Sequence, residues 1–137
     1  MLHPRQALQR THLDARSFLH PYRILVVEDE YLQAENLREE LEELGAEVLG
    51  PVPSVAAALA LLAAGTPVDA AILDVGLDGE TVFPVAEALQ ARRIPFVFAT
   101  GYDVSTLPRA YAHVPCCEKP FEMGHCVWAL FGQAVAA

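Results

Sequence analysis

From Tyr22 onward, short apolar runs alternate with longer segments that have helical spacing. Residues 24–27 form a continuous apolar run rich in β-branched side chains, which predicts a strand buried on both faces of a parallel sheet. In the next segment Ala34, Leu37, Leu41 and Leu44 recur at helical spacing, with glutamates on the other face. Gly45 follows directly and is predicted to close this helix.

The same alternation continues to the end of the chain. Strands are predicted at residues 46–49, 70–73, 96–99 and, more weakly, 114–117, and helices at 54–65, 82–91 and 121–135. Gly50-Pro51 is predicted to stop the second strand, and Ser54 to cap the helix after it. The stretch between Thr100 and Lys119 is short, so the fourth helix is predicted to be brief, about 106–112. Five strands alternating with about five helices predict a doubly wound α/β fold, with a parallel sheet and helices on both faces.

Size and composition favour one folded domain. The chain has 137 residues, of which 53% are hydrophobic and 20% charged, enough for a sizeable core and too few charges for a disordered chain. Residues 1–20 are polar and are predicted to be an extension, with the domain at 21–137.

Charge and cysteine content narrow the possible binding partners and the cellular compartment. The formal net charge of −9 excludes nucleic-acid binding through a basic surface. The three cysteines, Cys116, Cys117 and Cys126, lack the spacing of a zinc site or a disulfide framework, which favours a reducing cytoplasm. Neither a signal peptide nor a run of about 20 apolar residues is found, so no membrane partner is expected.

Polar residues stand where the predicted strands end. Glu28 and Asp29 follow the first strand, and Asp74 follows the third; Thr100 and Lys119 follow the fourth and fifth. In parallel sheets ligands bind at the carboxyl ends of the strands. Three carboxylates gathered there repel one another unless a cation lies among them, and oxygen ligands suit Mg²⁺. The lysine and the threonine hydroxyl add what an incoming phosphoryl group needs, a cation and a hydrogen-bond donor.

Each of these residues also has an ordinary structural explanation. Glu28 and Asp29 can begin a turn and cap the following helix, and Asp74 can be a loop carboxylate. Thr100 can belong to a turn and Lys119 to the solvated surface. Their joint placement at the carboxyl ends of strands in one predicted sheet favours a shared function over these separate explanations.

Four short blocks resemble those of response-regulator receiver domains, whose fold is flavodoxin-like (CheY-like). They are residues 24–30 (ILVVEDE), 72–75 (ILDV), 98–102 (FATGY) and 118–121 (EKPF). The resemblance covers residues 22 to about 135. The third block is similar to a subfamily of mostly single-domain receivers with a Phe-Ala-Thr-Gly-Tyr motif.

The resemblance implies a role for each matching position. Asp74 matches the phosphoacceptor, and Asp29 and Asp74 match the direct Mg²⁺ ligands, with the backbone carbonyl of Gly76. Glu28 matches the second acidic position of the metal site, Thr100 the switch hydroxyl, and Lys119 the lysine that pairs with a phosphoryl oxygen. The Lys119-Pro120 peptide is then expected to be cis. The implied donor is a phosphohistidine on a sensor histidine kinase or a histidine phosphotransfer protein.

The sequence departs from the family pattern in three places. Cys116 stands where most receivers have a switch aromatic, and Tyr102 is a hypothetical replacement. The loop at residues 76–79 lacks the proline common in the family. Gly76 also lacks a side chain that often controls water access to the phosphorylated carboxylate. Asp78 is predicted to lie in that loop and not at the strand end.

Three functions are compatible with these residues. The first is a phosphorylatable single-domain switch, which is not an enzyme and acts by binding an unidentified downstream protein or as a phosphate sink. The second is a pseudo-receiver, an interaction module independent of phosphorylation. The third is a phosphatase with an aspartyl nucleophile, which the sequence disfavours because such enzymes have a second Asp where this chain has Gly76. No glycine-rich nucleotide-binding loop follows the first strand.

Overall fold

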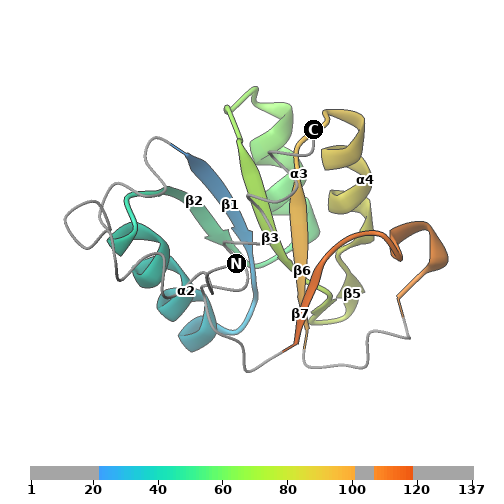
Figure 1. The fold of residues 1–137 in the computed structure, drawn as a ribbon, viewed down its shortest axis with the longest axis horizontal. Helices are drawn as coiled ribbons and strands as arrows, with labels where there is room; N and C mark the ends of the chain where they lie inside the picture. The colour runs from blue at the N-terminus through green and yellow to red at the C-terminus, as the bar shows by residue number, and fades with distance from the viewer. Residues whose placement is uncertain (1–21, 101–106, 119–137) are drawn as a thin grey trace, which may run out of the picture.

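A computed structural model describes residues 22–100 and 107–118 of the chain (Figure 1). Several sequence-based predictions fall outside these residues: the extension at 1–20, the last helix at 121–135, Tyr102, Lys119 and the Lys119-Pro120 peptide.

Five parallel strands form the main sheet, in the order β2-β1-β3-β6-β7. Their bounds are β1 Arg23–Val27, β2 Glu47–Val52, β3 Ala70–Asp74, β6 Phe96–Thr100 and β7 Cys116–Glu118. This order is that of flavodoxin-like sheets, which bind their ligands beyond the carboxyl ends of the strands. The predicted fold class, a doubly wound α/β sheet, is confirmed.

Helices cover both faces of the sheet (Figure 1). Helix α2 (Tyr31–Glu43) packs Leu37 and Leu41 on one face, against the side chains of Ile24 and Ile72. Helices α3 (Val55–Ala63) and α4 (Phe83–Ala91) pack on the other face. Gly45 follows α2 with a φ of 97°, and the hydroxyl of Ser54 accepts from the amide N–H of Ala57, so both predicted helix boundaries are confirmed. None of the described helices is long and apolar enough to cross a membrane.

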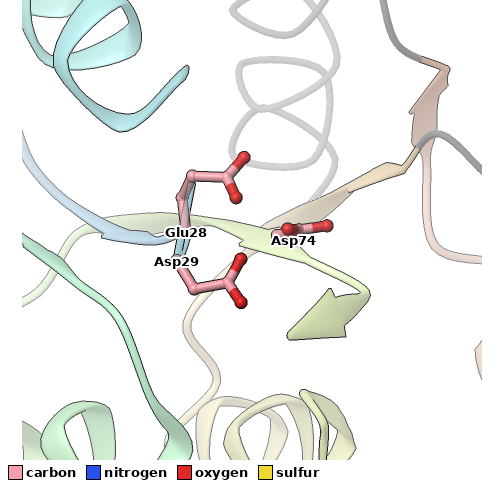
Figure 2. Close-up of side chains that lie close together, drawn as sticks. All are labelled: Glu28, Asp29 and Asp74. Carbon is pink, nitrogen blue, oxygen red and sulfur yellow. The ribbon is translucent and has the colours of Figure 1, made fainter. Parts of the chain in front are cut away.

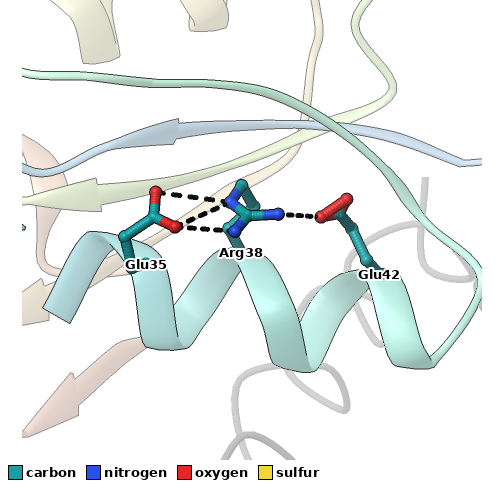
Figure 3. A network of polar contacts seen from close by, with 3 residues as sticks. All are labelled: Glu35, Arg38 and Glu42. Carbon is teal, nitrogen blue, oxygen red and sulfur yellow. Dashed lines mark hydrogen bonds and ion pairs between the residues drawn. The ribbon is translucent and has the colours of Figure 1, made fainter. Parts of the chain in front are cut away.

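One side of α2 has a small ion network (Figure 3). The guanidinium of Arg38 donates to the carboxylate of Glu35, at 2.6 Å from Nη2, and to that of Glu42 one turn further on. These three side chains keep 32% (Arg38), 32% (Glu35) and 45% (Glu42) of their surface in contact with solvent. The network connects successive turns on a partly exposed side of the helix.

Strand β2 does not stop at Gly50-Pro51, as the sequence predicted, but continues to Val52. The pairing with β1 shifts register between Leu25 and Val27, and the Gly50-Pro51 peptide is cis. Gly50 has a φ of 94°, and a Cβ there would lie 2.6 Å from the Val52 nitrogen and 3.1 Å from the Val26 oxygen. Only glycine fits this close approach. Because β2 is the edge strand, it tolerates a proline that donates no hydrogen bond to the sheet.

Two connections shape the carboxyl end of the sheet. After β3 the chain forms a small antiparallel hairpin, β4 (Gly76–Leu77) and β5 (Glu80–Thr81), with Asp78 and Gly79 at its turn. After β6, a single 3-10 turn, η3 (Arg109–Tyr111), lies where the brief fourth helix was predicted. The predicted fifth strand is present as β7, although it begins two residues later than expected.

Candidate functional site

Three carboxylates meet at the carboxyl end of the central strands (Figure 2). One oxygen each of Glu28, Asp29 and Asp74 lies within 4.8 Å of the others. Glu28 and Asp74 are 6% and 7% exposed, and Asp29 is half-buried. Figure 2 shows the Asp29 and Asp74 side chains directed to the same space, with that of Glu28 above them. The sequence-based prediction that these residues gather is confirmed.

The sheet register explains why these side chains meet. Strands β1 and β3 are parallel neighbours, and Val27 is paired with Leu73. The next residue on each strand is an acid, Glu28 on one side and Asp74 on the other. Both strands are buried and apolar in the residues just before that point, so hydrophobic burial fixes where the carboxylates stand.

Helix capping does not account for Glu28 and Asp29. Glu30 caps α2, because its carboxylate accepts from the amide N–H groups of Leu32 and Gln33, the second at 2.8 Å. The carboxylate of Glu28 accepts from the Glu30 amide at 3.2 Å. Of the ordinary explanation for the first acidic pair, the capping part is therefore wrong, whereas the bond from the Glu30 amide shows that Glu28 does belong to the turn before α2.

The β4–β5 hairpin reaches the acidic cluster. The backbone N–H of Asp78 donates to Oδ2 of Asp29 at 2.6 Å, across 49 residues of sequence. The carboxylate of Glu80, on the other side of the turn, accepts from the amide N–H of Val55 at the start of α3, at 3.1 Å. Sequence reasoning did not single out either contact. The Asp78-Gly79 dipeptide, a common hairpin turn, was the one available signal.

Of the remaining predicted site residues, the structure describes the backbone of some and not of others. Thr100 ends β6, which pairs with β3 so that Asp74 lies opposite Ala99, one residue earlier. Gly76 opens β4, two residues past Asp74. Lys119 directly follows Glu118, which pairs with Thr100, but lies outside the described residues. The backbone thus brings Asp74 and Thr100 to neighbouring strand ends.

Cys116, at the position of the expected switch aromatic, lies on the strand next to an aromatic cluster. It is half-buried, pairs with Phe98 in the sheet, and packs against the same core as Phe83 and Tyr111. The ring of Tyr111 stacks on that of Phe83, with centroids 5.3 Å apart, and meets Phe98 edge to face. Burial, and secondarily the charge of Glu87, raises the pKa of the Tyr111 hydroxyl. The aromatic surface on this side of β6 therefore comes in part from η3.

The chemistry of the acidic cluster suits a hard divalent cation. Its candidate ligand atoms are carboxylate oxygens, and two of the three residues are buried, where like charges repel strongly. A cation at that point offsets the repulsion, and no described histidine or cysteine belongs to the group. The donor set fits a magnesium-type ion better than zinc.

Comparisons with known proteins point to one family. No protein-family model matches the sequence, and no curated protein is similar enough to match. Among solved structures, SdrG from Sphingomonas melonis Fr1 is 46% identical, with a TM-score of 0.70, over 80% of this chain and 96% of that one. A structure of the BeF3-activated conformation of SdrG from Pseudomonas melonis Fr1 is 45% identical, with a TM-score of 0.67, over 82% of this chain and 95% of that one.

Two further structures extend this similarity. The response regulator PhyR from Brucella abortus is 30% identical, with a TM-score of 0.65, over 83% of this chain and 47% of that one. The response regulator TrrA from Thermotoga maritima, solved in complex with Mg²⁺-BeF, is 25% identical, with a TM-score of 0.69, over 82% of this chain and 98% of that one. With this fold and this extent of identity, the chain belongs to the response-regulator receiver domains.

Proposed function

We propose that this protein is a phosphorylatable signalling switch that accepts a phosphoryl group on Asp74. The observation that supports it most is the cluster of Glu28, Asp29 and Asp74, with Asp74 at the end of the central strand β3. Mg²⁺ would be held by Asp29 and Asp74, by the backbone carbonyl of Gly76 and, through water, by Glu28. The TrrA structure, solved with Mg²⁺-BeF, supports this choice of metal.

The transfer would proceed by attack of an Asp74 carboxylate oxygen on the phosphorus of a phosphohistidine. An O–P bond forms, the N–P bond breaks, and the imidazole nitrogen keeps the electron pair of the broken bond. Bound Mg²⁺ supplies charge neutralisation at the phosphoryl oxygens. By family resemblance, Lys119 would pair with one phosphoryl oxygen and the Thr100 hydroxyl would donate to another. The protein is itself the acceptor, so we propose a switch and not an enzyme.

The phosphohistidine donor would dock beside the cluster. Tyr31 and Leu32 are the large hydrophobic residues exposed in the described chain, at 73% and 67%, and they open α2 two residues after Asp29. Exposed apolar side chains next to a reactive carboxylate suit a protein donor, a sensor histidine kinase or histidine phosphotransfer protein. The phosphorylated form would act by binding another protein or serve as a phosphate sink. We place the protein in a reducing cytoplasm, which its cysteine content favours.

Intact mass spectrometry tests the proposal. The purified chain is incubated with acetyl phosphate, with and without Mg²⁺, alongside Asp74→Asn and the control Asp78→Asn. We expect a gain of about 80 Da, one phosphoryl group, that requires Mg²⁺ and disappears in Asp74→Asn only. Asp78→Asn is a matched control because it removes the nearest loop carboxylate but keeps the backbone N–H.

A second measurement separates the alternatives if no mass gain appears. Beryllofluoride mimics the phosphoryl group without being hydrolysed. Binding of beryllofluoride and Mg²⁺ to the wild-type chain would indicate rapid hydrolysis of the phosphorylated form. No binding would indicate a pseudo-receiver, an interaction module independent of phosphorylation.

A further inference from the structure

The β4–β5 hairpin joins two parts of the molecule that are distant in sequence. On one side of its turn, the Asp78 N–H holds Oδ2 of Asp29, one of the carboxylates of the acidic cluster. On the other side, the Glu80 carboxylate holds the Val55 N–H, the first amide of α3. The hairpin therefore connects the proposed metal ligand Asp29 to the start of a helix on the face of the sheet that α3 and α4 cover.

The contact with Asp29 fixes the orientation of a metal ligand. A carboxylate rotates about its Cβ–Cγ bond, and a short hydrogen bond from a backbone amide selects one rotation. With Oδ2 held by Asp78, the other oxygen is left for a cation. Hydrogen bonds of this kind, made by groups that do not touch the metal, tune metal affinity.

The hydrogen bond between Glu80 and the start of α3 holds the hairpin itself in place. Two-residue strands make few backbone hydrogen bonds and are marginally stable alone. Residues 78–81 are exposed, so little burial holds this part of the hairpin in place. The bond from Glu80 to a helix N-terminus supplies an anchor, since the first amides of a helix have no partner within it.

We infer that Glu80 is a positioning residue for the metal site: by anchoring the hairpin to α3, it keeps the Asp78 amide where it orients Asp29 for cation binding. This inference rests on the proposed function, because it assumes that Asp29 is a metal ligand. It also predicts a coupling in the opposite direction. A cation that fixes Asp29 should hold the hairpin more firmly and thereby protect the Val55 amide.

The test measures Mg²⁺ affinity of the full chain by calorimetric titration, for Glu80→Ala, Glu80→Gln and Ser54→Ala. The Ser54 hydroxyl also caps α3, by accepting from the Ala57 amide at 3.1 Å, but makes no hydrogen bond to the hairpin within the described residues. Ser54→Ala therefore controls for loss of a helix cap. We expect about tenfold weaker Mg²⁺ binding in Glu80→Ala, the lower limit for loss of a group acting through a metal ligand. Ser54→Ala should bind as the wild type does.

Glu80→Gln separates anchoring from charge. Its side-chain oxygen still accepts from the Val55 amide, but the negative charge is gone. Wild-type affinity in Glu80→Gln supports the anchor. Affinity as weak as that of Glu80→Ala would overturn it, because the effect would then be the electrostatic attraction of Glu80 for the cation.

A second variant acts on the other end of the hairpin. In the described chain, the positive φ of the turn falls on Gly79, at 75°, and not on Asp78. Such turns accept proline at their first central position, so Asp78→Pro removes the N–H with little strain. We expect Mg²⁺ binding at least as weak as in Glu80→Ala, and no further loss when both changes are combined.

The outcomes distinguish the two levels of the proposal. If the wild-type chain does not bind Mg²⁺, the proposed function fails and the inference with it. If the wild type binds Mg²⁺ and Glu80→Ala binds equally well, only the inference fails. Slower amide exchange at Val55 on adding Mg²⁺, lost in Glu80→Ala, would support the coupling; unchanged exchange in the wild type would contradict it.

Discussion

The strand-end cluster of Glu28, Asp29 and Asp74 can be compared with a second group of carboxylates, on one side of α2. On α2, Glu35 and Glu42 flank Arg38, whose guanidinium donates to both in the presence of solvent (Figure 3). At the strand ends, three carboxylates converge, two of them buried, with an oxygen of each within 4.8 Å (Figure 2). Solvent and the Arg38 guanidinium on the same helix compensate the negative charges of Glu35 and Glu42.

The difference indicates which of the two acidic groups the proposed function uses. The α2 network lies on a partly exposed side of the helix, at the spacing of ordinary helical ion pairs, each of which contributes little to stability. The strand-end cluster brings like charges into partial burial, which costs free energy in the folded state. A protein retains such an arrangement where a bound cation can offset the cost.

Mg²⁺ should stabilise the protein through the strand-end cluster alone. At a free concentration one hundred times the dissociation constant, one site raises the free energy of unfolding by about 2.7 kcal/mol. We expect this increment in the wild type and in Arg38→Met, and its near disappearance in Asp29→Asn. Chemical denaturation with and without Mg²⁺ measures it. An equal increment in Asp29→Asn would place the cation elsewhere.

Neutralising one carboxylate should change the free energy of unfolding in opposite directions in the strand-end cluster and in the α2 network. Without metal, Asp29→Asn relieves repulsion from Glu28 and Asp74, while the Asn oxygen still accepts from the Asp78 amide. We expect the free energy of unfolding to rise by about 1 kcal/mol at low ionic strength. Glu35→Gln, which weakens an attraction to Arg38, should lower it. Denaturation in a chelating buffer gives both signs, and a destabilised Asp29→Asn would contradict the first.

Removing Arg38 should have a smaller effect. Arg38→Met keeps a long side chain on the helix but removes both ion pairs of the α2 network. We expect a small decrease in the thermal midpoint that shrinks as salt is added, because exposed pairs are screened. Phosphorylation of Asp74 by acetyl phosphate should not change. A loss of phosphorylation would mean that the network reaches the site.

The smallest effect concerns pH. Hydrogen bonding from Arg38, with its charge, lowers the pKa of the Glu35 carboxyl below the ordinary value of 4.5. The stabilisation from this pair is therefore complete above pH 4.5 and is lost as the pH falls through the lowered pKa. Burial, and secondarily the charge of Glu43, raises the pKa of Glu40, which acts in the opposite direction. The difference between the wild-type and Glu35→Gln stability curves isolates the Glu35 part, and parallel curves would contradict it.

Strands buried on both faces of the sheet were the easiest elements to predict from the sequence. The apolar runs of β1 and β3 and the Ser54 cap depend on local pattern, so the strand ends, and with them Glu28, Asp29 and Asp74, could be located. The continuation of β2 through Gly50-Pro51 could not, because it depends on an edge position and on a close approach to Val26. The hairpin was missed because two-residue strands have no detectable periodicity. Its bonds to Asp29 and Val55 arise only in the folded chain.

The central position of β3 in the sheet limits how often the backbone that carries Asp74 opens to solvent. Its five residues are buried, and it pairs with β1 on one side and β6 on the other. Amides in such a strand exchange with solvent only when the whole domain opens, whereas the exposed turn at residues 78–79 opens far more often. Asp74 therefore stays in place for as long as the domain remains folded. The carboxylate of Asp74 is thus attached to the part of the site whose backbone is expected to open least often.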